Sequence, residues 1–214
     1  MKIAPSLLSA DFGRLREEIE MINESEADVF HVDVMDGRFV PNISFGFPIM
    51  QVLARYARKP LDVHLMIVEP EAYVDRFMDA GSQWLSFHLE ATPHAHRLLN
   101  RIRDKGVRAG LAINPQTSTL LCSELLTELD FVNLMSVNPG FGGQSFIEGT
   151  FGKIQQLDAI RKERGLNFEI EIDGGVGMAN ALPLKTAGAD ILVAGNAVFG
   201  ASDPGRKISE LKWV

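Results

Sequence analysis

Short apolar or β-branched runs alternate along the chain with longer segments of helical periodicity. The runs begin at intervals of 23 to 37 residues, which leaves room for one strand, one helix and two loops in each repeat. The pattern therefore predicts eight parallel strands, each followed by a helix. The predicted strands begin near Ile3, Phe30, Leu61, Trp84, Arg108, Phe131, Phe168 and Ile191.

The segments between the runs place apolar residues on one helical face. Three such stripes are Leu15, Ile19 and Ile22, then Ile49, Val52, Leu53 and Tyr56, and then Val74, Phe77 and Met78. Glycine follows several of these segments and predicts a left-handed C-cap that ends each helix before the next strand. These glycines are Gly81, Gly106, Gly165 and Gly188.

Eight such repeats, with no linker between them, predict a single-domain (β/α)8 TIM barrel over residues 1–214. An open doubly wound sheet is the alternative. Its G-x-G-x-x-G turn is missing after the first predicted strand, where residues 9–13 read SADFG. The segment from Ile3 to Ala10 is short and contains Pro5, so we interpret it as this strand rather than as a secretion signal.

Four of the predicted strands carry polar residues on the face that points into the barrel. Buried parallel strands are usually almost continuously apolar, and an unpartnered buried charge costs several kcal/mol, so these side chains need partners. Their partners could be one another, a metal ion or a substrate. The inward faces carry His31, Asp33 and Met35, then Asp62, His64 and Met66, then Ser86, His88 and Glu90, and then Glu169, Glu171 and Asp173.

Four of these residues lie toward the C-terminal strand ends, where barrel active sites are found. Two imidazoles and two carboxylates suit one divalent ion per chain, either Zn²⁺, Fe²⁺, Mn²⁺ or Co²⁺. A hydrogen-bonded polar core is the alternative. We expect Glu169 and Glu171 to be structural, and His88 and Glu90 to support the site. The predicted ligands are His31, Asp33, His64 and Asp173.

Glycine-rich loops follow the sixth, seventh and eighth predicted strands. Glycines let backbone N–H groups approach a phosphate closely, and this end of a barrel often holds one. Tight turns also use glycine, but three such loops beside the polar cluster favour a phosphate site. The loops contain Gly140, Phe141, Gly142 and Gly143, then Gly174 and Gly175, and then Gly195 and Asn196.

The composition narrows the class of protein. Hydrophobic residues make up 46% of the chain and charged residues 23%, which indicates a globular domain rather than a disordered or membrane-spanning one. The net charge of −7 argues against a nucleic-acid surface, although backbone amides can still bind an anionic small molecule. The single cysteine, Cys122, cannot form an internal disulfide, so we expect a reducing, cytoplasmic location.

Six segments resemble the ribulose-phosphate 3-epimerase family, and the resemblance extends from residue 3 to about residue 200. They are residues 3–12 (IAPSLLSADF), 31–37 (HVDVMDG), 39–42 (FVPN), 61–66 (LDVHLM), 135–144 (MSVNPGFGGQ) and 171–176 (EIDGGV). The resemblance implies a metal-dependent sugar-phosphate epimerase that acts on a small ketose phosphate and forms a homo-oligomer. It assigns the metal to His31, Asp33, His64 and Asp173. It assigns substrate contacts to Ser6, His64, Gly140, Phe141, Gly142, Gly143, Gly174, Gly175, Gly195 and Asn196.

Three methionines, Met35, Met66 and Met135, match family positions near the reacting carbons, and core filling is their alternative role. The chain departs from the family at Arg38, where histidine is frequent. It also departs at residues 177–178, where an asparagine-containing turn is common. Both departures leave the substrate preference open.

The chemistry of a ketose phosphate agrees with this resemblance. The C2 carbonyl acidifies the proton on C3, and a divalent metal stabilises the resulting enediolate as a Lewis acid. Asp33 and Asp173 come from separate strands and could exchange protons on opposite faces of the intermediate. The expected reaction interconverts D-ribulose 5-phosphate and D-xylulose 5-phosphate.

Three alternatives remain at this point. An epimerase for a ketohexose phosphate such as D-allulose 6-phosphate would use the same residues. A phosphate-binding decarboxylase would place a lysine among the strand-end carboxylates, and none of the polar strand faces carries one. A non-catalytic sugar-phosphate binder would need neither a metal nor two opposed bases.

Overall fold

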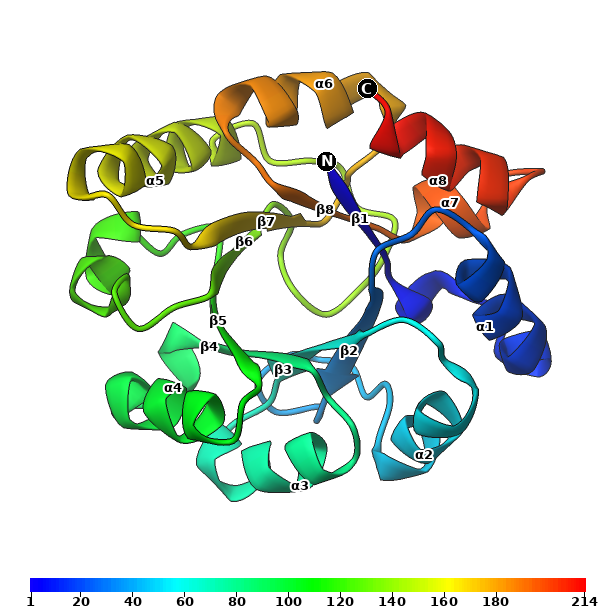
Figure 1. The fold of residues 1–214 in the computed structure, drawn as a ribbon, viewed down its shortest axis with the longest axis horizontal. Helices are drawn as coiled ribbons and strands as arrows, with labels where there is room; N and C mark the ends of the chain where they lie inside the picture. The colour runs from blue at the N-terminus through cyan, green and yellow to red at the C-terminus, as the bar shows by residue number, and fades with distance from the viewer.

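The computed structural model describes residues 1–214 as a ring of parallel strands surrounded by helices (Figure 1). The sheet has eight strands in the order β1-β8-β7-β6-β5-β4-β3-β2, which confirms the predicted (β/α)8 barrel. The strands are β1 (Lys2–Pro5), β2 (Phe30–Met35), β3 (Leu61–Met66), β4 (Trp84–His88), β5 (Arg108–Ile113), β6 (Phe131–Met135), β7 (Glu169–Asp173) and β8 (Ile191–Ala194).

The α-helices lie outside the strands. They are α1 (Leu15–Glu24), α2 (Phe47–Tyr56), α3 (Val74–Asp79), α4 (Ala95–Asp104), α5 (Thr150–Arg164), α6 (Met178–Ala187), α7 (Asn196–Phe199) and α8 (Pro204–Lys212). Gly165 and Gly188 cap α5 and α6 with φ angles of 64° and 117°, as the sequence predicted. None of the helices is both long enough and apolar enough to cross a membrane.

The connection after β5 differs from the prediction, because it forms a 3₁₀ helix, η5 (Thr119–Leu125), in place of an α-helix. The start of this connection is committed to other contacts. The Lys153 ammonium on α5 donates to the carbonyls of Asn114, Pro115 and Thr117, which ties the start of this connection to α5. The Ser118 side chain then caps the short η5 helix by accepting from Leu120 N–H.

The ring closes between β1 and β2 through one parallel bridge that joins Ser6 to His31. Ser6 is the first residue after β1, and the bridge brings it beside the strand that carries Asp33. The Ser6 hydroxyl donates to Asp33 Oδ2 at 2.6 Å. Closure of the barrel therefore sets one wall of the space above the strands.

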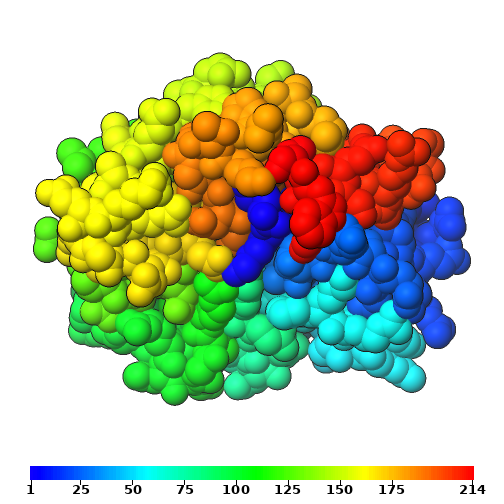
Figure 2. Space-filling model, turned by 45° about the horizontal axis from the view of Figure 1, so that its top comes forward, coloured from blue at the N-terminus to red at the C-terminus, as the bar shows by residue number.

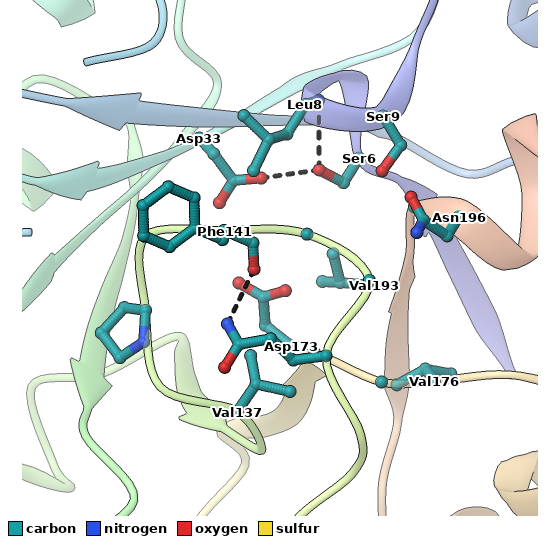
Figure 3. A pocket seen from close by; sticks show the side chains of 18 of the residues that line it. Ser6, Leu8, Ser9, Asp33, Val137, Phe141, Asp173, Val176, Val193 and Asn196 are labelled. Atoms are coloured by element: carbon teal, nitrogen blue, oxygen red, sulfur yellow. Dashed lines mark hydrogen bonds between the residues drawn. The ribbon is translucent and has the colours of Figure 1, made fainter. Parts of the chain in front are cut away.

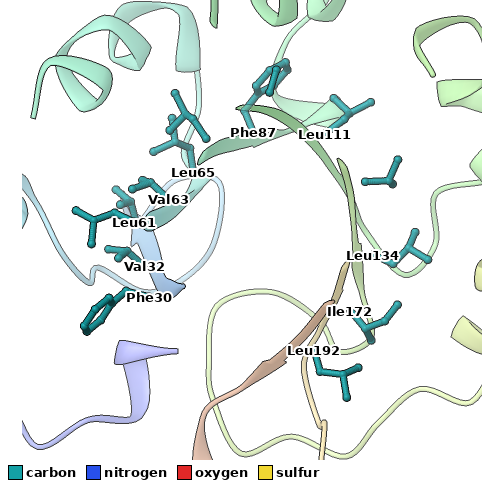
Figure 4. Close-up of a cluster of buried hydrophobic side chains, with 14 of the residues drawn as sticks. Phe30, Val32, Leu61, Val63, Leu65, Phe87, Leu111, Leu134, Ile172 and Leu192 are labelled. Carbon is teal, nitrogen blue, oxygen red and sulfur yellow. The ribbon is translucent and has the colours of Figure 1, made fainter. Parts of the chain in front are cut away.

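The main apolar core lies between the strands and the helices. Figure 4 shows apolar strand residues pointing outward from the ring, which leaves the alternate residues, several of them polar, to point inward. The outward residues include Phe30, Val32, Leu61, Val63, Leu65, Phe87, Leu111, Leu134, Ile172 and Leu192. This alternation explains how a barrel with polar strand faces can still bury a large apolar core.

The opposite, N-terminal end of the barrel is filled by aromatic rings and ion pairs. The Phe131 ring lies beside Trp84, with 5.7 Å between the ring centroids. Glu169 pairs with Lys2 and Arg108, each at 2.6 Å, so it is a structural residue as expected. The space-filling view in Figure 2 shows β1 reaching the surface beside the C-terminal helix, so the two ends of the chain pack together.

We expect Gly110→Ala to destabilise the barrel, because the added Cβ would lie 2.3 Å from the buried Phe131 ring. The expected loss of unfolding free energy is about 1–3 kcal/mol. Gly152→Ala is the matched control, since Gly152 is exposed within α5 and its added Cβ meets nothing within 4 Å. The control should gain up to about 1 kcal/mol. Urea denaturation measures both values, and an unchanged Gly110→Ala protein would contradict this packing.

Candidate active site

Four buried side chains from three strands converge inside the barrel, with Asp173 at the C-terminal end of its strand and His31, the second residue of β2, nearer the start of its strand than predicted. His31 and Asp33 come from β2, His64 from β3 and Asp173 from the last position of β7. Their four donor atoms all lie within 4.8 Å of one another. His31 Nε2 is 3.3 Å from Asp33 Oδ1 and 3.5 Å from Asp173 Oδ2. His64 Nδ1 is 3.2 and 3.3 Å from the same two oxygens.

These distances fit a small divalent cation. Donor atoms about 3.3 Å apart lie about 2.0 Å from the centre of a tetrahedron, or about 2.3 Å from the centre of a square, which is close to usual N and O ligand distances. His31 Nε2 is fully buried and makes no hydrogen bond, although both carboxylates are near it. An unpartnered imidazole nitrogen facing two carboxylates is a suitable metal donor. The cluster could therefore hold a metal ion.

The electrostatics of the cluster also favour a cation. Burial disfavours ionisation of Asp33, but His31 and His64 together lower its pKa. Burial likewise opposes a charge on His31, yet the carboxylates of Asp33 and Asp62 raise its pKa well above the ordinary value. The field that would hold protons on the imidazoles is the same field that attracts a metal ion to their lone pairs.

Each imidazole has a partner on the side that faces away from the cluster. His31 Nδ1 lies 2.7 Å from Asp62 Oδ2, and both residues are fully buried. His64 Nε2 lies 2.9 Å from His88 Nε2, whose own Nδ1 lies 3.3 Å from Glu90 Oε2. Burial lowers the pKa of His88 to about 4, so this imidazole is neutral near pH 7.

A further polar layer lies below the cluster, inside the barrel. Glu171 is fully buried and neither of its carboxyl oxygens has a hydrogen-bond partner. Burial, and then the negative charge of Asp62, raise the pKa of Glu171 well above its ordinary value. Both effects oppose a full negative charge on Glu171 beneath the four donor residues.

Above the cluster is a pocket of about 280 Å³ that Asp33 and Asp173 both line. Figure 3 shows the two carboxylates approaching this space from different strands. Met35, Met66 and Met135 are buried and also line the pocket, so they belong to its wall rather than only to the core. No lysine or arginine lines it.

Three glycine-rich loops form the other end of the pocket. Their backbone N–H groups are free, since the chain offers no hydrogen-bond acceptor to the amides of Gly142, Gly143, Gly174, Gly175, Gly195 and Asn196. A side chain at Gly175 would place its Cβ 2.7 Å from Phe146 N, and the Gly175 φ of 63° also disfavours one. The loops are thus packed closely around a set of unused donors.

Most of the sequence-predicted residues meet in this pocket. Ser6, Phe141 and Asn196 line it together with the glycines, whereas His31 and His64 lie just beneath it. Arg38 does not reach this pocket. It is exposed and lines a separate groove beside α2 and α3.

Three residues that shape the pocket were not predicted as site residues. Ser9 lines it next to Gly195. Asn42 donates to the Gly140 carbonyl at 2.8 Å, and Gln144 donates to the carbonyls of Asn138 and Phe141 at 2.7 and 2.8 Å. All three lie in the motifs quoted above, but only the folded loops show what each one contacts.

Comparison with known proteins agrees with this geometry. The family model described as "Ribulose-phosphate 3 epimerase family" matches residues 2–199. The chain belongs to this family. It is 46% identical to the ribulose-phosphate 3-epimerase of Bacillus subtilis, with 99% of this chain and 98% of that protein covered. It is 49% identical to the ribulose-phosphate 3-epimerase of Synechocystis, with 98% and 92% covered.

Membership of the ribulose-phosphate 3-epimerase family makes this protein an epimerase, and therefore an isomerase. The non-catalytic alternative is thereby set aside. Solved structures of more distant proteins share the barrel alone. They include a 3-hexulose-6-phosphate synthase (TM-score 0.69, 17% identity, 99% of this chain and 97% of that chain covered) and KGPDC from Streptococcus mutans (TM-score 0.73, 14% identity, 99% and 95% covered).

Proposed function

We propose that this epimerase interconverts D-ribulose 5-phosphate and D-xylulose 5-phosphate by inverting C3. The observation that carries the proposal is the pair of carboxylates, Asp33 and Asp173, which face one pocket from β2 and β7. Relatives 46% and 49% identical to this chain are named ribulose-phosphate 3-epimerases, which supports the same substrate. A homo-oligomer and a cytoplasmic location remain predictions from the family resemblance and the single cysteine.

The two aspartates act as acid and base on opposite faces of C3. One starts ionised and takes the C3 proton, which leaves a planar enediolate, while the other starts protonated and returns a proton to the opposite face. After one turnover their protonation states are exchanged, so one carboxylate must lose a proton to solvent and the other must gain one before the next turnover in the same direction. Asp33 Oδ2 accepts from Ser6, so the Ser6 hydroxyl orients this carboxylate.

His31, Asp33, His64 and Asp173 hold the divalent metal in this proposal. When bound, the metal supplies Lewis-acid stabilisation of negative charge on the oxygens next to C3. Met35, Met66 and Met135 exclude water from the reacting carbons, because they present thioether and methyl groups to the pocket.

The phosphate binds to the free backbone amides of the three glycine-rich loops. The residues that carry these amides line the pocket, and no lysine or arginine lines it with them. Amides of glycine loops bind phosphate without a cationic side chain, which is consistent with a chain of net charge −7. Phosphate binding at one end and the aspartates at the other place the C3 carbon between the two bases.

We expect His64→Ala to lose metal and activity together. Affinity for the metal should fall by more than about 100-fold, because even residues behind metal ligands contribute 10–100-fold. Elemental analysis and an epimerisation assay, before and after chelation and re-addition of Zn²⁺, Fe²⁺, Mn²⁺ or Co²⁺, measure both. His96→Ala is the control, since His96 is exposed on α4. Full occupancy in His64→Ala would contradict the assigned ligands.

We expect Gly195→Val to raise KM for the sugar phosphate by about tenfold or more, equivalent to about 1.4 kcal/mol. The added Cβ would lie 2.5 Å from Ser9 Oγ and would push side chains into the amide cradle. Gly149→Val is the control, because a Cβ at Gly149 meets nothing within 4 Å. Assays with D-ribulose 5-phosphate and D-allulose 6-phosphate also test the preference between the two substrates. An unchanged KM would place the phosphate elsewhere.

We expect Asp33→Asn and Asp173→Asn each to reduce epimerisation by at least about 10²–10⁴-fold with metal still bound, since each loses one proton-transfer group. Each variant should still exchange the C3 proton with deuterated solvent, but starting from only one epimer, and the two should favour opposite epimers. NMR of the recovered sugar phosphates detects this. If either variant epimerises at nearly the wild-type rate, the two-base assignment is wrong.

A further inference from the structure

The nitrogen of His64 that faces away from the ligand cluster is in contact with another imidazole. His64 Nε2 and His88 Nε2 lie 2.9 Å apart, and both side chains are fully buried. A hydrogen bond between two ring nitrogens needs one N–H and one lone pair. The direction of this bond therefore determines which nitrogen of His64 presents a lone pair to the ligand cluster.

Glu90 determines the direction of the bond. Its Oε2 lies 3.3 Å from His88 Nδ1, and its Oε1 accepts from Asn114 N–H at 2.9 Å and from the Thr117 hydroxyl. Burial alone would raise the pKa of Glu90, but bonds from His88, Thr117 and the Asn114 N–H lower it to about 2. An ionised carboxylate can only accept hydrogen bonds, so the proton of His88 lies on Nδ1.

The position of this proton on His88 Nδ1 determines the direction of the next hydrogen bond, between His88 and His64. With its proton on Nδ1, His88 accepts at Nε2, so His64 donates from its Nε2. His64 Nδ1 then carries the lone pair, and it is this nitrogen that lies 3.2 Å from Asp33 and 3.3 Å from Asp173. One carboxylate outside the cluster thus fixes the tautomers of two buried imidazoles in succession.

The outer end of this chain is itself anchored. Asn114 and Thr117, which hold Glu90, belong to the loop after β5 whose carbonyls Lys153 holds at 2.6 to 3.0 Å. The ring of His88 also packs against Phe39, with 4.6 Å between the ring centroids. We call this series of contacts from Glu90 through His88 to His64 the relay. Its supports begin at α5 on the outside of the barrel, and it runs through β4 to a predicted metal ligand on β3.

We propose that Glu90 and His88 are positioning residues that fix His64 with its Nδ1 lone pair toward the metal. The inference rests on the proposed metal site and goes beyond it, since neither residue is a ligand or a base. His31 is held differently, directly by Asp62, so the two imidazoles depend on separate supports. A merely structural role for His88 would affect the stability of the barrel and leave metal binding by the folded protein unchanged.

The test compares metal binding in His88→Leu and His88→Gln. Leucine removes the acceptor and leaves His64 N–H buried without a partner, whereas the glutamine oxygen can occupy the position of Nε2. We expect Co²⁺ affinity, measured by competition with a chelator, to fall about 10–100-fold in His88→Leu and to recover at least in part in His88→Gln. The visible absorption of bound Co²⁺ should change in His88→Leu. His94→Leu, an exposed histidine at the start of α4, is the matched control.

A double-mutant cycle tests the order of the relay. Glu90→Gln alone should weaken Co²⁺ binding, because it loses the charge that keeps the His88 proton on Nδ1. In the His88→Leu background the same change should have little further effect, since the path to His64 is already broken. If His88→Leu fails to fold, Glu90→Gln alone tests the relay.

The outcomes separate the two proposals. Wild-type protein that binds no Co²⁺ would overturn the metal site itself. If wild-type protein binds Co²⁺, an unchanged affinity and spectrum in folded His88→Leu, or in Glu90→Gln where His88→Leu does not fold, would overturn the relay alone. Additive effects of the Glu90 and His88 changes would also overturn it, because a relay requires them to act through one path.

Discussion

The carboxylates of Asp33 and Asp173 reach within 4.8 Å of each other in a barrel interior where both side chains are buried. When both carboxylates are ionised, two such charges about 4 Å apart repel each other by about 4 kcal/mol at an effective dielectric constant of about 20. The site therefore depends on positive charge being held between them. Two imidazole nitrogens that face the same oxygens supply the lone pairs through which a divalent cation can provide it.

Much of the surrounding structure maintains this arrangement. Asp62 contacts the imidazole of His31, and His88 contacts that of His64. The Ser6 hydroxyl donates to Oδ2 of Asp33, the oxygen that does not face the imidazoles. Outside the strands, an apolar core packs the helices against the barrel, so the polar interior is not needed for the main hydrophobic contribution to stability. The barrel can thus carry a costly polar centre because its apolar burial is located elsewhere.

The two ends of the pocket use different chemistry for different tasks. At one end, buried side chains with shifted pKa values supply charge and proton transfer at C3 in the proposed reaction. At the other, free amides of glycine loops supply donors that need no side chain and no titratable group. Because the amides are neutral, they can hold a phosphate without adding a cation that would compete with the metal position.

The sequence by itself determined the barrel, the inward and outward faces of its strands and the four residues of the cluster. Successive side chains of a strand point to opposite faces, so the sequence shows which residues face inward. The carboxyl ends of parallel strands also meet at one end of a barrel. The glycine loops were also predictable, since they follow strands whose ends meet there.

Only the tertiary structure decided the contacts that depend on register and closure. Nothing in a separation of 24 residues shows that His88 touches His64, because the height of β4 relative to β3 is set by pairing around the ring. The bond from Ser6 to Asp33 likewise needs the bridge that closes the ring. The sequence also did not show that the segment after β5 forms a 3₁₀ helix, or that Lys153, far along the chain, holds the start of that segment through three carbonyls. The repeat of apolar residues along a strand shows which way each side chain points. Which residues it contacts depends on the register between strands, and the local sequence pattern does not encode that register.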